Sequence, residues 1–113
     1  MHIEERAIDD VVVLDIKGKI VLGDGDALLK DKVNSLVNQG CKNIVLNLEA
    51  VPYIDSAGLG EVVRTYTTVS KNNGHLKLLS VTKRIRDLLV ITKLETVFET
   101  FESESDAVKS FKA

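Results

Sequence analysis

The segment from Glu49 to Gly60 holds the side chains best suited to chemistry in this chain, and it reads Glu-Ala-Val-Pro-Tyr-Ile-Asp-Ser-Ala-Gly-Leu-Gly. Asp55 and Ser56 carry short oxygen-bearing side chains, which cap the first turn of a helix because they accept hydrogen bonds from its unpaired amides. The positive end of a helix also favours an anion, so a phosphate on Ser56 would be tolerated there. The segment therefore predicts a hydroxyl that can be modified without unfolding the protein.

Two glycines follow the serine inside the predicted helix. Gly58 and Gly60 each cost the helix about 1 kcal/mol relative to alanine, which indicates that another segment or a partner approaches this backbone closely. Pro52 stiffens the loop before the helix and removes one amide donor. A plain helix cap with tight packing against the sheet would explain the same residues, so the local sequence leaves both interpretations open.

We expect no catalytic role for Ser56. It is outside a Gly-x-Ser-x-Gly turn, and the only histidines are His2, near the start, and His75, which opens a predicted strand. The run Gly58 to Gly60 lacks the third glycine of a dinucleotide-binding turn. The acids in Gly23-Asp24-Gly25-Asp26 are too few for a calcium loop and suit a helix-starting turn. The sequence therefore predicts no enzyme activity, no cofactor and no metal.

The composition is that of one soluble domain over residues 1–113, with 44% hydrophobic and 28% charged residues. A net charge of −2, with acids and bases interspersed, gives no basic stripe for nucleic acid. No run approaches the ~18 apolar residues of a membrane span, and the first residues do not resemble a signal peptide. A single cysteine, Cys41, fits a reducing compartment, so we expect a cytoplasmic protein.

Hydrophobic periodicity predicts alternating strands and helices. Short apolar runs predict five strands, and stripes at helical spacing predict four helices between and after them. The expected order is β-β-α-β-α-β-α-β-α, an α/β sandwich with a mixed, mostly parallel sheet. The predicted strands are Ile3 to Ile8, Val11 to Ile16, Ile44 to Leu48, Leu76 to Val81 and Val97 to Phe101. The predicted helix boundaries are Gly40 and Asn73-Gly74 as stops, Thr82 as a cap, and Ser103 or Ser105 as the last cap.

The third predicted helix carries more apolar residues than one face can bury. Some of Val90, Ile91 and Leu94 are therefore expected to be exposed. An extra contact with the last strand is the first explanation, and a partner surface is the second.

The run Tyr53-Ile54-Asp55-Ser56-Ala57-Gly58-Leu59-Gly60, after a strand ending Val45-Leu46-Asn47-Leu48, resembles the signature of the STAS family, the bacterial anti-sigma factor antagonists. The resemblance extends over essentially the whole chain. In that family the matching serine is phosphorylated by an anti-sigma factor that is itself a kinase, and the unphosphorylated form sequesters this kinase and releases the sigma factor. The resemblance thus implies Ser56 as phosphoacceptor, an anti-sigma factor serine kinase as partner and a phosphatase that acts on phosphorylated Ser56. The implied partner surface comprises Tyr53, Asp55, Ser56, Ala57, Gly58, Leu59 and Gly60, with Asp24 from the preceding loop.

One position departs from the family pattern. Many members carry an acid three positions after the glycine that ends the second strand, whereas Gly18 is followed at that spacing by Val21. Asp24 or Asp26 could supply the acid from the same loop. The departure leaves open a STAS scaffold or transporter accessory subunit without phosphoregulation. We expect a monomer or a weak dimer.

Overall fold

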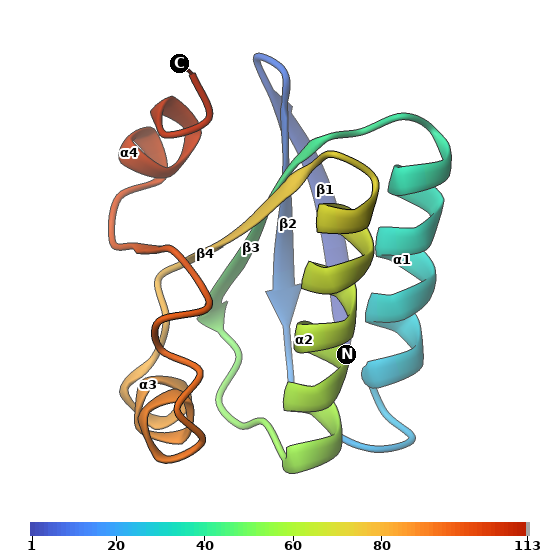
Figure 1. Cartoon of the computed structure of the whole chain (residues 1–113). Coiled ribbons are helices and arrows are strands. Elements are labelled where there is room, and N and C mark those ends of the chain that lie inside the picture. The colour runs from blue at the N-terminus through green and yellow to red at the C-terminus, as the bar shows by residue number, and fades with distance from the viewer. Residues whose placement is uncertain (113) are drawn as a thin grey trace.

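The computed structural model describes residues 1–112, and its elements follow the predicted order (Figure 1). One sheet has the strand order β1-β2-β3-β4-β5, with β1 antiparallel to β2 and the later neighbours parallel. The prediction of a mixed, mostly parallel sheet with four helices is confirmed. The elements are β1 (His2–Ile8), β2 (Val11–Lys17), α1 (Asp26–Asn38), β3 (Asn43–Ala50), α2 (Ser56–Lys71), β4 (His75–Leu79), α3 (Lys83–Ile91), β5 (Thr100–Phe101) and α4 (Glu104–Lys109).

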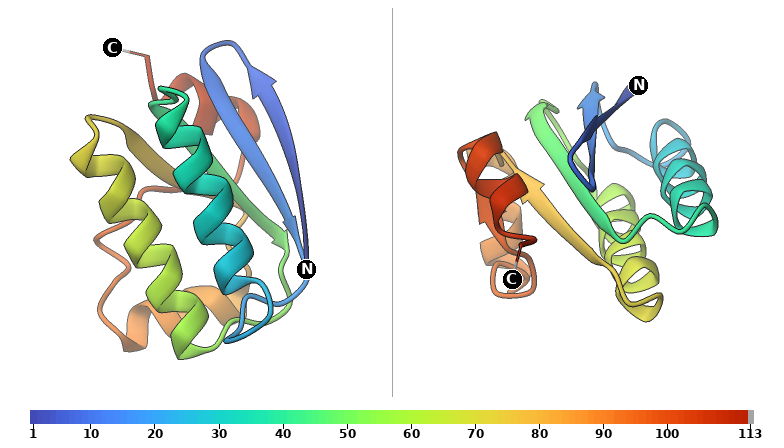
Figure 2. Two further views of the ribbon diagram at one scale, coloured as in Figure 1. Left: turned by 90° about the vertical axis from the view of Figure 1, so that its right-hand side faces the viewer. Right: turned by 90° about the horizontal axis from the view of Figure 1, so that it is seen from above.

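Helices cover both faces of the sheet (Figure 2). On one face, Leu14 and Leu46 belong to a large core that includes buried residues of α1 and α2 and the apolar side of α3. On the other, Val13 and Val45 pack in a smaller core with Val108 of α4. This coverage explains why β2 and β3 read as continuous apolar runs.

Polar side chains also attach α4 to the sheet. Arg6 on β1 donates from Nε to Asp15 Oδ2 on β2 at 2.6 Å, and its second nitrogen donates to Glu104 at the start of α4. At the other end of α4, the buried Lys77 of β4 donates to Ser110 Oγ at 2.9 Å. The short last helix is thus held at both ends.

The helix boundaries follow the predicted local signals. Gly40 has a φ of +88°, and Asn73 takes the left-handed conformation with φ +63°. Gly74 is required for a different reason, because a methyl group there would lie 2.5 Å from the carbonyl oxygen of Lys42. Thr82 caps α3, and Ser103 rather than Ser105 caps α4.

Two predicted strands are shorter than expected. The strand predicted over Val97 to Phe101 is wrong except at Thr100–Phe101, because Phe98 packs edge-on against Tyr66 with ring centroids 5.1 Å apart. The burial of Phe98 therefore accounts for the alternation of apolar and polar residues that resembled a strand. The strand predicted to Val81 ends at Leu79, since Ser80 has a positive φ of 55°. Within residues 1–112, no helix has the length and apolar character needed to span a bilayer.

Candidate functional site

Asp55 fixes the start of α2, beyond the carboxyl end of β3. Its Oδ1 accepts a hydrogen bond from the Gly58 amide at 2.7 Å, and its Oδ2 accepts one from the Leu22 amide at 3.1 Å. The hydrogen bond from Gly58, followed by that from Leu22, lowers the pKa of the Asp55 carboxyl. Of the two predicted caps, Asp55 is therefore the cap, and Ser56 is the first helical residue, with an exposed side chain.

The loop between β2 and α1 runs beside this segment. The Ile20 amide donates to the Tyr53 carbonyl at 3.1 Å, and the Asp55 amide donates to the Ile20 carbonyl at 3.3 Å. Ile20 and Ile54 form an isolated parallel bridge, and both side chains are buried. The loop and the start of α2 are therefore one packed unit.

The two glycines of α2 have different surroundings. A methyl group at Gly58 would lie 1.9 Å from the carbonyl oxygen of Ile20, so only glycine fits there. At Gly60 the nearest neighbour would be the flexible end of Arg64 at 3.6 Å, which leaves room for a side chain. The prediction of a close backbone approach holds for Gly58 and is wrong for Gly60 as far as contacts within the chain are concerned.

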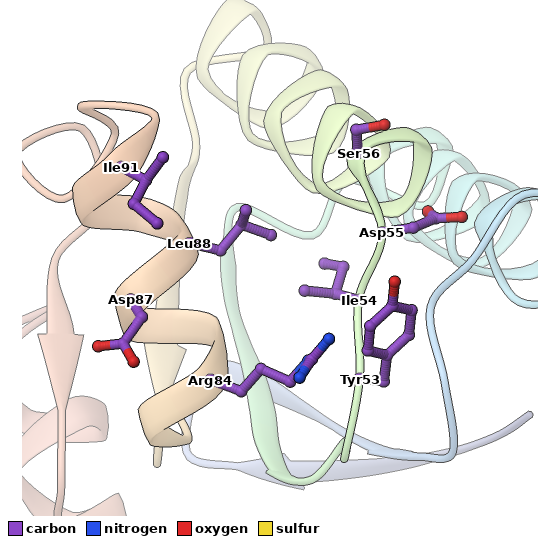
Figure 3. A pocket seen from close by; sticks show the side chains of 8 residues that line it. All are labelled: Tyr53, Ile54, Asp55, Ser56, Arg84, Asp87, Leu88 and Ile91. Atoms are coloured by element: carbon purple, nitrogen blue, oxygen red, sulfur yellow. The ribbon is translucent and has the colours of Figure 1, made fainter.

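A groove of about 460 Å³ separates this segment from α3 (Figure 3). The Arg84 guanidinium of α3 lies over the Tyr53 ring, with its central carbon 4.3 Å from the ring centroid. Apart from Ser56, the remaining lining is apolar or acidic. The lining residues are Tyr53, Ile54, Asp55, Ser56, Arg84, Asp87, Leu88 and Ile91.

Two apolar side chains of α3 face solvent, and one of them, Ile91, lines this groove. Ile91 is 77% exposed and Val90 is 53% exposed, whereas Leu94 is partly buried against the main core. The first explanation of the apolar excess, contact with the last strand, is therefore wrong for Val90 and Ile91. Leu22, whose amide donates to the Asp55 carboxylate, is a further exposed apolar residue, at 74%.

The predicted site residues are only partly brought together at the surface. Tyr53, Asp55 and Ser56 line the groove and Ala57 is half-buried beside them, whereas Gly58 and Leu59 are buried. These two buried residues shape the site from beneath.

The acids of the β2–α1 loop occupy different positions. Asp26 accepts from the amides of Gly23 and Ala27, which makes it part of a helix-starting turn as predicted. Asp24 pairs with Val21 through two backbone hydrogen bonds of 3.0 Å, and its side chain is exposed. In the described part of the chain, no hydrogen bond joins Asp24 to Ser56.

The α3 half of the groove was missed by sequence reasoning. Arg84, Asp87, Leu88 and Ile91 all line it, and the sequence does not reveal that α3 lies opposite Ser56. The apolar excess of the third helix was the one available signal.

Comparison with known proteins identifies the family. The model of the STAS domain family matches residues 2–107. The chain belongs to the STAS domain family. A Thermotoga maritima protein named as a candidate anti-sigma factor antagonist is 25% identical over 107 residues, covering 95% of each chain. The anti-sigma-B factor antagonist of Staphylococcus aureus is 35% identical over 74 residues, covering 66% of this chain and 68% of its own.

Solved structures agree with this STAS assignment. A crystal structure of a candidate anti-sigma factor antagonist from Thermotoga maritima superposes with a TM-score of 0.90 at 26% identity, covering 98% of this chain and 95% of that one. Unphosphorylated SpoIIAA, an anti-sigma factor antagonist, superposes with a TM-score of 0.74 at 17% identity, covering 99% of each chain, and so supports the fold alone. The two relatives and the two solved structures named above are thus anti-sigma factor antagonists by name.

The two glycines provide a matched test of the packing at the site. We expect Gly58→Ala to lower the free energy of unfolding by about 1–3 kcal/mol or more, because the methyl group collides with backbone. Gly60→Ala should be neutral or stabilising by about 0.5–1 kcal/mol, because alanine is the better helix former. Urea unfolding followed by circular dichroism measures both. Equal stability of Gly58→Ala and the wild type would contradict this packing.

The ionised Asp55 carboxylate should support folding in a defined pH range. A carboxyl whose pKa is lowered on folding stabilises the protein above its ordinary pKa of about 3.9, and this is lost as the pH falls through the folded value. Asp55→Asn removes the charge and keeps only one of the two accepting oxygens. Urea midpoints should show the wild type more stable at neutral pH, with the gap narrowing in acid. A gap that is absent at neutral pH, or that does not narrow in acid, would rule out this role.

Proposed function

We propose that this STAS domain is an anti-sigma factor antagonist that binds an anti-sigma factor with serine kinase activity while Ser56 is unphosphorylated. Phosphorylation of Ser56 releases the partner, and a phosphatase restores binding, so that sigma-factor-dependent transcription in the cytoplasm is regulated by partner switching. In this account the chain is the substrate of the kinase and not itself an enzyme. The observation that carries the proposal is the exposed Ser56 at the rim of a groove with solvent-exposed apolar residues.

The surroundings of Ser56 suit a protein partner. Ile91 lines the same groove, and the exposed Leu22 donates its amide hydrogen bond to the capping carboxylate. Apolar side chains exposed together are typical of interaction sites, and interface energy usually concentrates in a few such residues. A partner seated across this surface would cover Ser56.

The magnitudes favour release over unfolding as the effect of a phosphate. At the start of α2 an anion is favoured by about 0.3–1 kcal/mol, so the fold tolerates phosphorylation. In a closed interface the phosphate adds about −1.5 to −2 charges beside Asp55, and an unpaired buried charge costs about 3–5 kcal/mol. The interface effect is larger and corresponds to about a hundredfold to several-thousandfold weaker binding.

Substitutions at Ser56 test the switch. Ser56→Ala should bind the anti-sigma factor as tightly as the unphosphorylated protein, because the Ser56 side chain is exposed and its hydroxyl makes no hydrogen bond within residues 1–112. Ser56→Asp should bind roughly tenfold or more weakly, because its charge enters the interface next to Asp55. Calorimetric titration of each variant with the anti-sigma factors of the source organism gives the Kd values. Equal affinities of the two variants for the anti-sigma factor would contradict the proposed mechanism.

Ile91 tests the location of the interface. Replacement by serine removes an exposed apolar side chain, so Ile91→Ser should leave the unfolding midpoint unchanged and weaken anti-sigma factor binding by about tenfold. Val97→Ser is the matched control, because Val97 is also exposed, at 37%, and lies outside the groove. Equal losses for both variants, or no loss for Ile91→Ser, would place the interface elsewhere.

A further inference from the structure

Arg84 differs from its charged neighbours on α3. Lys83 is paired with Asp87 at 2.8 Å, and Arg86 is paired with Glu102 at 3.5 Å. Arg84 makes no ion pair within residues 1–112 and instead lies over the ring of Tyr53 (Figure 3). It is also the only basic residue among the described residues that line the groove.

Helix stability does not explain this position. Arg84 lies in the first turn of α3, where the positive end of the helix dipole disfavours a cation. The contact of an exposed guanidinium with an aromatic ring is weak. Arg84 is therefore held loosely, in the same groove that Ser56 lines.

We propose that Arg84 binds the phosphate of phosphorylated Ser56 within the same chain. The guanidinium leaves the Tyr53 ring and forms charge-assisted hydrogen bonds with the phosphate oxygens, which are stronger than the contact they replace. This inference rests on the proposed function in one respect, namely that Ser56 is the residue that carries a phosphate.

The charges around Ser56 direct a phosphate toward Arg84. On one side lies the Asp55 carboxylate, which stays ionised because it accepts hydrogen bonds from the Gly58 and Leu22 amides, and which repels a phosphate. On the other side lies the groove. Asp87 is the other acid of the groove, and Lys83 offsets its charge. Repulsion from Asp55 and attraction to Arg84 therefore act in the same direction.

The required movement is confined to two side chains. The Ser56 hydroxyl points away from α3, and rotation about its Cα–Cβ bond into another staggered position turns the substituent toward the groove (Figure 3). Arg84 has a long flexible side chain, and its guanidinium already extends across the groove to Tyr53. A phosphate held by Arg84 would then occupy the groove itself. Pairing with Arg84 would offset part of the phosphate charge, and the phosphate would then also obstruct the partner by filling the groove.

The second ionisation of the phosphate reports on this contact. The full chain is prepared with phosphoserine incorporated at position 56 during synthesis, and the phosphorus NMR shift is followed against pH at low salt. A nearby guanidinium stabilises the dianion, so the wild type should titrate about half a pH unit or more below Arg84→Gln. Arg84→Lys keeps the charge and should restore most of the difference. Arg86→Gln is the matched control and should titrate like the wild type.

The outcomes separate this inference from the proposed function. An unchanged midpoint in Arg84→Gln, or an equal change in Arg86→Gln, would overturn the role of Arg84 and leave partner switching intact. Because the phosphoserine is installed without a kinase, failure of the anti-sigma factor to phosphorylate Ser56 would overturn the proposed function without affecting this titration.

Discussion

The hydrogen bonds of the Asp55 carboxylate join two segments of the chain, the start of α2 and the β2–α1 loop, through the amides of Gly58 and Leu22. The absence of a side chain at Gly58 lets the Ile20 carbonyl reach the helix, so the loop and helix pack without a gap. Ser56 is the next residue after the cap, and its exposure follows from this arrangement. The position of the hydroxyl is thus fixed by the same contacts that start α2.

The opposite wall of the groove depends on the order of the strands. Because β4 lies beside β3 and both are parallel, the segments that leave their carboxyl ends meet at one edge of the sheet. This places Arg84 over Tyr53 and Ile91 on the rim of the groove that contains Ser56. Both walls are attached to the same sheet. Phosphorylation would therefore change the charge at Ser56 and the contact between Arg84 and Tyr53, and the fold would stay the same.

The sequence predicted well those structural features that depend on residues close together along the chain. The covered strands β2 and β3, the left-handed Asn73 and the caps at Asp55 and Thr82 follow from local patterns and were anticipated. Features set by distant contacts were not. Phe98 is buried against Tyr66, so the turn that contains it has the alternating pattern of a strand. Nothing near Arg84 in the sequence reveals that it lies over Tyr53. The serine half of the site was therefore predictable, and the α3 half was not.

The central claim is that Ser56 accepts a phosphoryl group from the anti-sigma factor partner. Intact-mass measurement after incubation with this partner and ATP tests it most directly, with Ser56→Ala treated in parallel. The account predicts that the wild type gains the mass of one phosphoryl group and that Ser56→Ala gains none. No gain in the wild type, or an equal gain in Ser56→Ala, would contradict it.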